Sequence, residues 1–261
     1  MRIPFVLLLL SATAVGCADA RTPDDAEPAT DALAATDAAA ADTIVIADGR
    51  VFAEAEDVSD WDGRAPVQAA FAAARAHWQA QDPSYEEETQ VMAVAEGSFS
   101  QPGVSQYAAL YLMSSWPRCC PKMGIAVVQD GELVRNVAFE SPAHGLAAIP
   151  DLDGDGLDEL AITGSFGMGG ENMTSVTLVS LADSGLRTWG GETIQYDACA
   201  AMQEGGEASR ITAVAGPAFT IERFALASCE TGEYEAGGPP EPFEFTAPAP
   251  GDELSVELPV P

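Results

Sequence analysis

Basic side chains are scarce in this chain of 261 residues. It contains 11 lysines and arginines against 41 aspartates and glutamates, so its formal net charge is -30. A protein that binds nucleic acid needs a basic face for the phosphates, and this composition therefore excludes a nucleic-acid partner. The same charge repels anionic phospholipid headgroups, so we expect no direct contact between the protein surface and a membrane.

Residues that commonly carry catalysis are also few. The chain has two histidines, His77 and His144, and its lysine is Lys122. It lacks the GxSxG motif of serine hydrolases and the GK[ST] motif of phosphate-binding loops. A Ser-His-Asp arrangement would have to use one of the two histidines, of which His144 is the better candidate by position. The glycine-rich segment 164–170 is interpreted as a flexible loop.

Long apolar runs are absent except at the N-terminus. Residues 1–16 consist of one early arginine followed by about a dozen apolar residues, which is typical of a secretory signal peptide and too short to span a bilayer. The segment Ala14-Val15-Gly16-Cys17 resembles the lipobox of bacterial lipoproteins, in which the cysteine is acylated and becomes the first mature residue. The alternative is an ordinary signal peptide with an unrelated cysteine.

The lipobox resemblance implies a location. A lipid on Cys17 would be the protein's membrane contact, since several acyl chains together anchor a protein stably. Ala18 follows the cysteine where inner-membrane lipoproteins usually carry Asp, so the resemblance favours an outer-membrane lipoprotein that faces the periplasm or the cell surface. Residues 17–42 are rich in Ala and Asp and contain no aromatic residue, and we expect them to form a disordered acidic tether.

Residues 43–261 are predicted to form a single, mainly β domain. A helix over about 66–81 is expected to pack on a sheet, because its apolar residues recur at helical spacing: Val67, Phe71, Ala74 and Trp78. From residue 89 onward, short apolar runs alternate with turn residues, and Asp130-Gly131 is a strong hairpin signal. This pattern is typical of a sandwich, barrel or propeller. The proline-rich tail from about residue 237 is expected to be loosely ordered, apart from a possible strand at 243–245.

The cysteines fit an exported protein. Besides Cys17 there are four, an even number that suits disulfides in an oxidising compartment: Cys119, Cys120, Cys199 and Cys229. Four cysteines allow three pairings, and the sequence alone does not choose among them. Because neighbouring cysteines rarely bond each other, we favour Cys119 and Cys120 each bonding one of the distant pair.

The acidic segment Asp151-Leu152-Asp153-Gly154-Asp155-Gly156-Leu157-Asp158-Glu159 carries the clearest chemical signal. Calcium takes six to eight oxygen ligands, and alternate residues of a tight turn can direct oxygens at one centre. The predicted calcium ligands are Asp151, Asp153, Asp155, the backbone carbonyl of Leu157, and Glu159, which closes the shell. Asp158 is expected to face solvent. Position 12 of the loop is Ile162 instead of Glu and a strand follows, so the loop is not an EF-hand.

With its flanking apolar segments, this loop resembles the FG-GAP or VCBS-type repeat of integrin-like β-propellers. The resemblance covers about residues 140–182 and implies a structural calcium ion in a loop that joins two strands of a blade. No second DxDxDG motif occurs in the chain. We therefore predict a small or partial β-propeller-like fold, or alternatively a β-sandwich that carries one blade-like hairpin.

Three functional hypotheses follow. The first is a lipid-anchored, non-enzymatic calcium-binding module of the cell envelope that presents a β surface to a protein or glycan. The second is a calcium-dependent hydrolase of envelope or extracellular polysaccharide, in which acidic residues near the loop act as acid and base. The third is a purely structural envelope component whose acidic surface gathers divalent cations.

Overall fold

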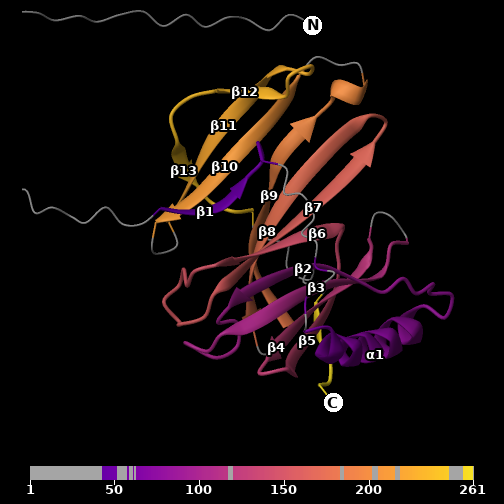
Figure 1. Cartoon of the computed structure of the whole chain (residues 1–261). Helices are drawn as coiled ribbons and strands as arrows, with labels where there is room; N and C mark the ends of the chain where they lie inside the picture. Colours follow the sequence, from indigo (N-terminus) through magenta and orange to yellow (C-terminus); the bar gives the residue numbers. More distant parts are fainter. Residues whose placement is uncertain are drawn as a thin grey trace, which may run out of the picture. The chain divides into compact units, whose positions relative to one another are not determined.

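The computed structural model describes residues 43–51, 58, 61, 63–116, 120–182, 185–201, 205–214, 218–246 and 255–260. These residues form two antiparallel sheets and one α-helix (Figure 1), which confirms a mainly β fold with one packed helix. The proposed signal peptide, Cys17 and the tether lie outside the described residues. Within the described part of the chain, no helix has the length and apolar character needed to cross a membrane.

The small sheet has the strand order β14-β5-β4-β3-β2. Its strands are β2 (Gln90–Gly97), β3 (Gln106–Ser114), β4 (Lys122–Gln129), β5 (Glu132–Glu140) and β14 (Val256–Glu257). The hairpin predicted at Asp130-Gly131 is confirmed between β4 and β5, where both residues have positive φ, of 50° and 79°. Such a turn matches the twist of the two strands that it connects.

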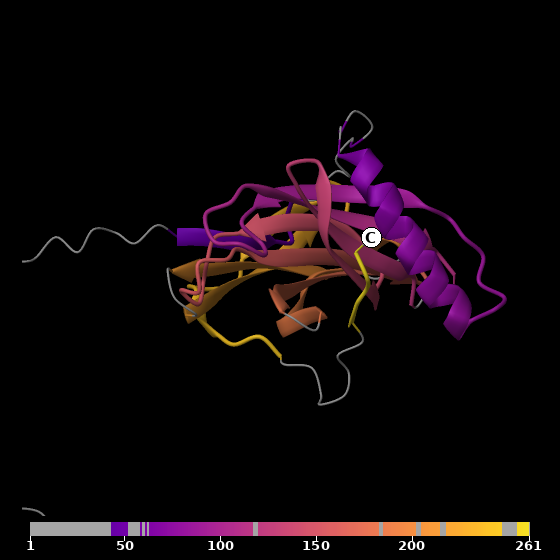
Figure 2. The ribbon, with the colours of Figure 1, turned by 90° about the horizontal axis from the view of Figure 1, so that it is seen from below.

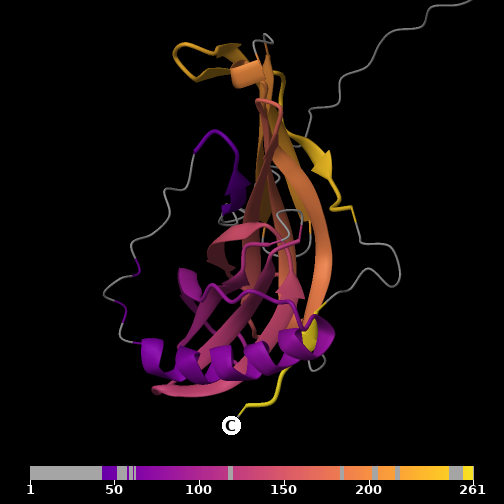
Figure 3. The same ribbon diagram turned by 90° about the vertical axis from the view of Figure 1, so that its right-hand side faces the viewer.

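Helix α1 (Arg64–Gln81) lies across one face of the small sheet, as Figures 2 and 3 show. Its apolar stripe is buried and includes Val67, Phe71 and Trp78. The buried Asn136 side chain joins helix and sheet, because its Nδ2 donates to the Ala70 carbonyl at 3.1 Å and its Oδ1 accepts from Tyr111 at 2.7 Å. The helix prediction over 66–81 is therefore confirmed, with a start two residues earlier at Arg64.

The large sheet has the order β12-β11-β10-β9-β8-β7-β6, with β1 paired to β10 and β13 paired to β11. Its strands are β1 (Thr43–Asp48), β6 (Ala143–Ile149), β7 (Glu159–Met168), β8 (Glu171–Ala182), β9 (Gly185–Asp197), β10 (Gly206–Val214), β11 (Ala218–Ser228), β12 (Glu233–Ala236) and β13 (Glu241–Phe243). A 3₁₀ turn at Cys199–Ala201 follows β9. The segment 164–170 is thus not a flexible loop, because β7 continues to Met168 and pairs with β8.

Alternating side chains of the large sheet enter two different cores. Leu160 and Ile162 pack with residues of the small sheet, so this core lies between the two sheets. Ala161, between them in sequence, points to the other face and packs with side chains of β1, β10 and β11. Successive side chains of β7 therefore point to opposite faces of the sheet. One face packs against the small sheet, and the other packs against side chains of β1, β10 and β11.

Strand β1 occupies the edge of β10 that β9 leaves open. β10 pairs with β9 only through Gly206–Ala208, whereas β1 pairs with β10 from Arg210 to Val214. Gly49, directly after β1, packs tightly against the backbone of Ile194 on β9, where an added Cβ would lie 1.8 Å from the carbonyl oxygen. Glycine is required here because any side chain would collide with that strand.

Two sequence-based predictions need correction. Cys199 forms its disulfide with Cys229, with Cα atoms 5.6 Å apart, so the favoured pairing with Cys119 and Cys120 was wrong. The ends of β9 and β11 lie close enough for this bond, and Cys119 lies outside the described residues. The tail from about residue 237 also contains the paired strands β13 and β14, and Leu258 donates its N–H to the Asn136 carbonyl at 2.7 Å.

Candidate metal centre

The acidic loop is the turn of the β6–β7 hairpin. Ile149 pairs with Glu159 in the antiparallel register, so residues 150–158 connect the two strands. Gly154 and Gly156 have φ values of 80° and 87°, which place both in the left-handed region that favours glycine. These glycines turn the backbone sharply, and the carboxylates of alternate residues point toward one centre.

The three aspartates at alternate positions come together. One carboxylate oxygen from each of Asp151, Asp153 and Asp155 lies within 4.8 Å of the others. Asp151 is half-buried, whereas Asp153 and Asp155 are exposed. Two carboxylates about 4 Å apart repel by roughly 4 kcal/mol at an effective dielectric constant of 20, so a cation at their centre would relieve a substantial repulsion. Such a group of oxygens could hold a metal ion.

Backbone N–H groups hold these carboxylates in place. Asp151 accepts from Gly154 at 2.7 Å and from Gly156 at 2.9 Å, and Asp155 accepts from Leu157 at 2.8 Å. The N–H of Asp155 in turn donates to Asp153 at 3.3 Å. An ionised carboxylate has about four acceptor positions. These contacts therefore orient the side chains and leave them acceptor capacity for an ion.

Glu159 is placed differently from the three aspartates. Its side chain is 1% exposed, its Oε2 accepts from the Leu152 N–H at 2.9 Å, and its Oε1 accepts from the Ser180 hydroxyl at 3.3 Å. Burial raises the pKa of Glu159 to about 7, and the nearby charges of Asp153 and Asp151 act in the same direction. Glu159 thus holds the backbone of the loop through its bond with Leu152 and is not one of the three converging carboxylates.

Asp158 does not face solvent as predicted. Its Oδ2 accepts from the N–H of Ser98 at 2.7 Å, its N–H donates to the Ser98 carbonyl at 2.8 Å, and its Oδ1 accepts from Asp151 at 3.2 Å. These bonds tie the loop to the connection between β2 and β3. The prediction failed because this partner lies 60 residues away in sequence.

Arg187 is a member of the site that the sequence did not reveal. Its guanidinium donates to Asp153 at 2.5 Å and to the Ser180 hydroxyl at 3.1 Å, and it lies 5.5 Å from the ring of Trp189. Ser180 also accepts from the indole N–H of Trp189 at 2.7 Å. The positive side chain therefore connects Asp153 to the buried Glu159 through Ser180.

Comparison with known proteins adds no relative: the chain matches no protein-family model, no curated protein and no solved structure. The geometry of the loop and of the surrounding sheets is therefore the basis of the functional proposals below.

Proposed function

We propose that this protein is a lipid-anchored calcium-binding module of the bacterial cell envelope that presents a β surface to a protein or glycan. The convergence of Asp151, Asp153 and Asp155 carries the proposal. Calcium fits this donor set better than softer metals, because the convergent atoms are carboxylate oxygens. The resemblance to the FG-GAP or VCBS-type loop supports a structural ion, since the loop joins two paired strands here as well.

Strand β7, which begins at the loop, also supports the proposed binding surface. Near its far end, Phe166 pairs directly with Met173 of β8, and Met168 lies two residues further on the same face. Their side chains are exposed by 38%, 42% and 74%. Exposed apolar groups on one face are typical of interaction sites. A calcium ion in the turn would stiffen the strand that displays them.

The polysaccharide hydrolase receives less support. Acid–base catalysis would favour a carboxyl whose pKa is raised toward neutrality, and Glu159 has that property. However, its side chain is 1% exposed and both its oxygens accept hydrogen bonds from the protein. A polymer chain has no access to such a group. We therefore favour the binding module over the enzyme.

Calorimetric titration with calcium chloride tests the metal site. The unaltered protein is expected to bind one ion and to unfold several degrees higher with calcium than with chelator. A variant with Asp153→Asn and Asp155→Asn should bind on the order of 100-fold more weakly, because two of the charged ligands are neutralised. Asp130→Asn is the matched control, since it removes one charge at a turn where Asn tolerates positive φ. Equal affinities for all three proteins would refute the site.

Two further measurements address the anchor and the surface. Cys17→Ser should release the protein from membranes, and mass spectrometry of the unaltered protein should find acyl chains on that residue. Capture from envelope extract should depend on the apolar face, so that Met168→Lys loses the partner while calcium affinity is kept. Retention of Cys17→Ser on membranes would contradict the lipid anchor.

A further inference from the structure

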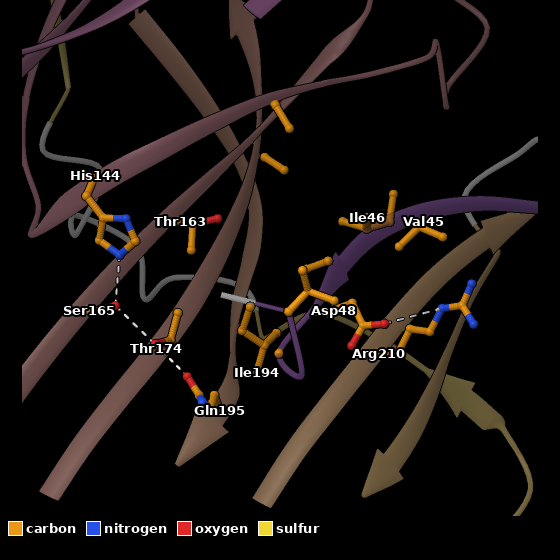
Figure 4. A pocket seen from close by; sticks show the side chains of 15 residues that line it. Val45, Ile46, Asp48, His144, Thr163, Ser165, Thr174, Ile194, Gln195 and Arg210 are labelled. Atoms are coloured by element: carbon orange, nitrogen blue, oxygen red, sulfur yellow. Dashed lines mark hydrogen bonds and ion pairs between the residues drawn. The ribbon is translucent and has the colours of Figure 1, made fainter. Parts of the chain in front are cut away.

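A cavity of about 420 Å³ lies beside β1 (Figure 4). It is on the face of the large sheet that carries Ala161, opposite the small sheet. Its volume is within the range of small-molecule binding sites. Much of the wall is aliphatic and includes Ile46, Ala147, Ala161 and Ile194. Strand β1 pairs with β10, and Gly49 packs against β9. The cavity therefore lies where β9 and β10 separate from each other.

One wall of the cavity carries a row of polar side chains on four adjacent strands (Figure 4). His144 on β6 contacts Ser165 on β7 at 2.8 Å, and Ser165 contacts Thr174 on β8 at 3.0 Å. Thr174 donates to Gln195 on β9 at 3.2 Å. Gln195 in turn donates to the hydroxyl of Tyr234 on β12 at 3.2 Å. The imidazole therefore ends a continuous hydrogen-bond chain across the sheet.

The protons of this chain run in one direction. The Gln195 Nε2 donates to Tyr234, so its Oε1 accepts the hydroxyl proton of Thr174. A hydroxyl has a single proton, and Ser165 must therefore donate to Thr174. His144 must then donate to Ser165 through Nε2–H.

This direction leaves the other imidazole nitrogen, Nδ1, as a hydrogen-bond acceptor. Among the described residues, none donates to His144 Nδ1, and His144 lines the cavity. Burial lowers the pKa of His144, which keeps the ring neutral near pH 7. The cavity thus contains one accessible acceptor at the end of a fixed hydrogen-bond chain.

The same direction argues against Ser165 as a nucleophile. A catalytic histidine accepts the proton of its serine, whereas here the histidine donates to the serine oxygen. Within the described part of the chain, no carboxylate bonds to His144 to reverse that polarity. The pair is therefore suited to hold a ligand and not to activate a hydroxyl.

The charged groups near the cavity compensate each other. Asp48 accepts two hydrogen bonds from the Arg50 guanidinium, at 2.9 and 2.6 Å, and lies 3.9 Å from Arg210. Glu222 lies directly opposite Arg210 in the register of β10 and β11. Two acidic and two basic side chains thus balance at this wall. The four charges sum to zero, which favours an uncharged ligand, and the buried Nε of Arg210, which has no hydrogen-bond partner among the described residues, leaves one further donor at this wall.

We propose that this cavity binds a small uncharged molecule with an apolar body and one hydroxyl group, such as an alcohol or phenol, whose hydroxyl donates to His144 Nδ1. The aliphatic wall contacts the body of the molecule, and the row of polar side chains fixes the imidazole that accepts the hydrogen bond of its hydroxyl. The site is separate from the metal loop, which lies at the other end of the β6–β7 hairpin.

Displacement of the uncharged fluorescent probe N-phenyl-1-naphthylamine tests the proposal, with the full chain carrying Cys17→Ser so that no acyl chains or detergent interfere. 1-Naphthol should displace the probe at about tenfold lower concentration than 1-methoxynaphthalene, which lacks the donor hydrogen and leaves Nδ1 unpaired. His144→Phe should reduce this difference to less than about twofold. His77→Phe, at the other histidine, should preserve it. Equal displacement by the two naphthalenes in the unaltered site would overturn the assignment.

Filling the cavity gives a second, independent outcome. Ala147 lines the cavity and is exposed, so Ala147→Phe should abolish probe binding with little effect on the core. Ala225→Phe, at an exposed strand position on β11, is the control and should bind the probe normally. Undiminished binding by Ala147→Phe would show that the probe binds elsewhere.

The proton direction can be measured without a variant. Nitrogen-15 NMR of the two histidine rings distinguishes Nε2–H from Nδ1–H imidazole, and His144 is expected to carry its proton on Nε2 at neutral pH. Addition of 1-naphthol should shift the Nδ1 resonance of His144 and leave His77 unchanged. A proton on Nδ1 in the ligand-free protein would refute the hydroxyl acceptor.

Discussion

The two ends of the β6–β7 hairpin carry candidate sites of opposite chemistry. Its turn gathers three aspartates within five consecutive residues, two of them exposed to solvent. Its open end contributes His144 and Ser165 to a neutral row completed by β8 and β9. The first site is local in sequence and strongly charged, whereas the second exists only when four strands pair. We therefore expect the two sites to respond differently to the same change.

Removal of the Cys199–Cys229 disulfide should have the largest effect, and it should affect the cavity more than the acidic loop. It joins the segments just after β9 and β11, close to Gln195 and Tyr234, which complete the polar row. Closing a loop of this length, 30 residues, stabilises a protein by about 3–4 kcal/mol in the chain-entropy model. Replacing both cysteines by serine should lower the free energy of unfolding by that amount in urea titrations. Probe binding should weaken while calcium affinity is kept, and equal losses at both sites would remove the distinction.

Glu159 should give the metal-free loop a pH dependence opposite in sign to that of His144 in the cavity, whose pKa is lowered by burial. The folded pKa of about 7 is above the ordinary value of 4.5, so the stabilising contribution is complete below about pH 4.5 and is lost as pH rises through about 7. The loss amounts to about 3 kcal/mol.

Urea unfolding in chelator from pH 4 to 8 measures this loss. Glu159→Gln should remove it, because the amide cannot ionise, and calcium should reduce it in the unaltered protein. If the unaltered protein and Glu159→Gln show parallel pH profiles, the buried carboxyl does not titrate as described.

Gly156→Ala should disturb the turn more than the remainder of the hairpin. The residue has a φ of 87°, and an added Cβ would lie 3.1 Å from Pro102. We expect a loss of about 1–2 kcal/mol in unfolding free energy and a weaker affinity for calcium. Gly103→Ala is the control, because its φ is 69° and an added Cβ would meet nothing within 4 Å. The difference between the two variants measures the Pro102 contact, and identical losses would mean that backbone strain accounts for the whole effect.

Arg187→Gln should produce the smallest effect, and in the opposite direction. The guanidinium of Arg187 pairs with Asp153 and places a positive charge beside the proposed cation. Its removal should tighten calcium binding by about three- to tenfold at low salt. The gain should shrink as ionic strength rises, and calorimetry at two salt concentrations would detect this. Weaker binding by the variant would show that Arg187 organises the loop more than it opposes the ion.

The sequence predicted those features in which interacting residues are neighbours. The helix follows from the spacing of Val67, Phe71 and Trp78, and the convergence of the three aspartates follows from their alternate positions in one turn. The partners of Asp153 and Asp158 were not predictable, because Arg187 and Ser98 approach only after the strands pair. The polar row, with one residue from each of several strands, gave no local signal.

Glycine content misled the interpretation of segment 164–170. Gly164 lies on β7, where an added Cβ would be 2.8 Å from the Pro142 carbonyl oxygen, and at Gly167 it would be 2.5 Å from the side chain of Asn172. These glycines permit close approach within a paired strand and do not mark a flexible loop. Composition alone does not distinguish these two roles.

The position of β14 bears on the order of events during synthesis. Val256 and Glu257 extend the sheet at β5, and Leu258 is buried with the helix against that sheet. The core beneath α1 is therefore completed only when residues 256–258, which follow the helix by about 175 positions, have been synthesised.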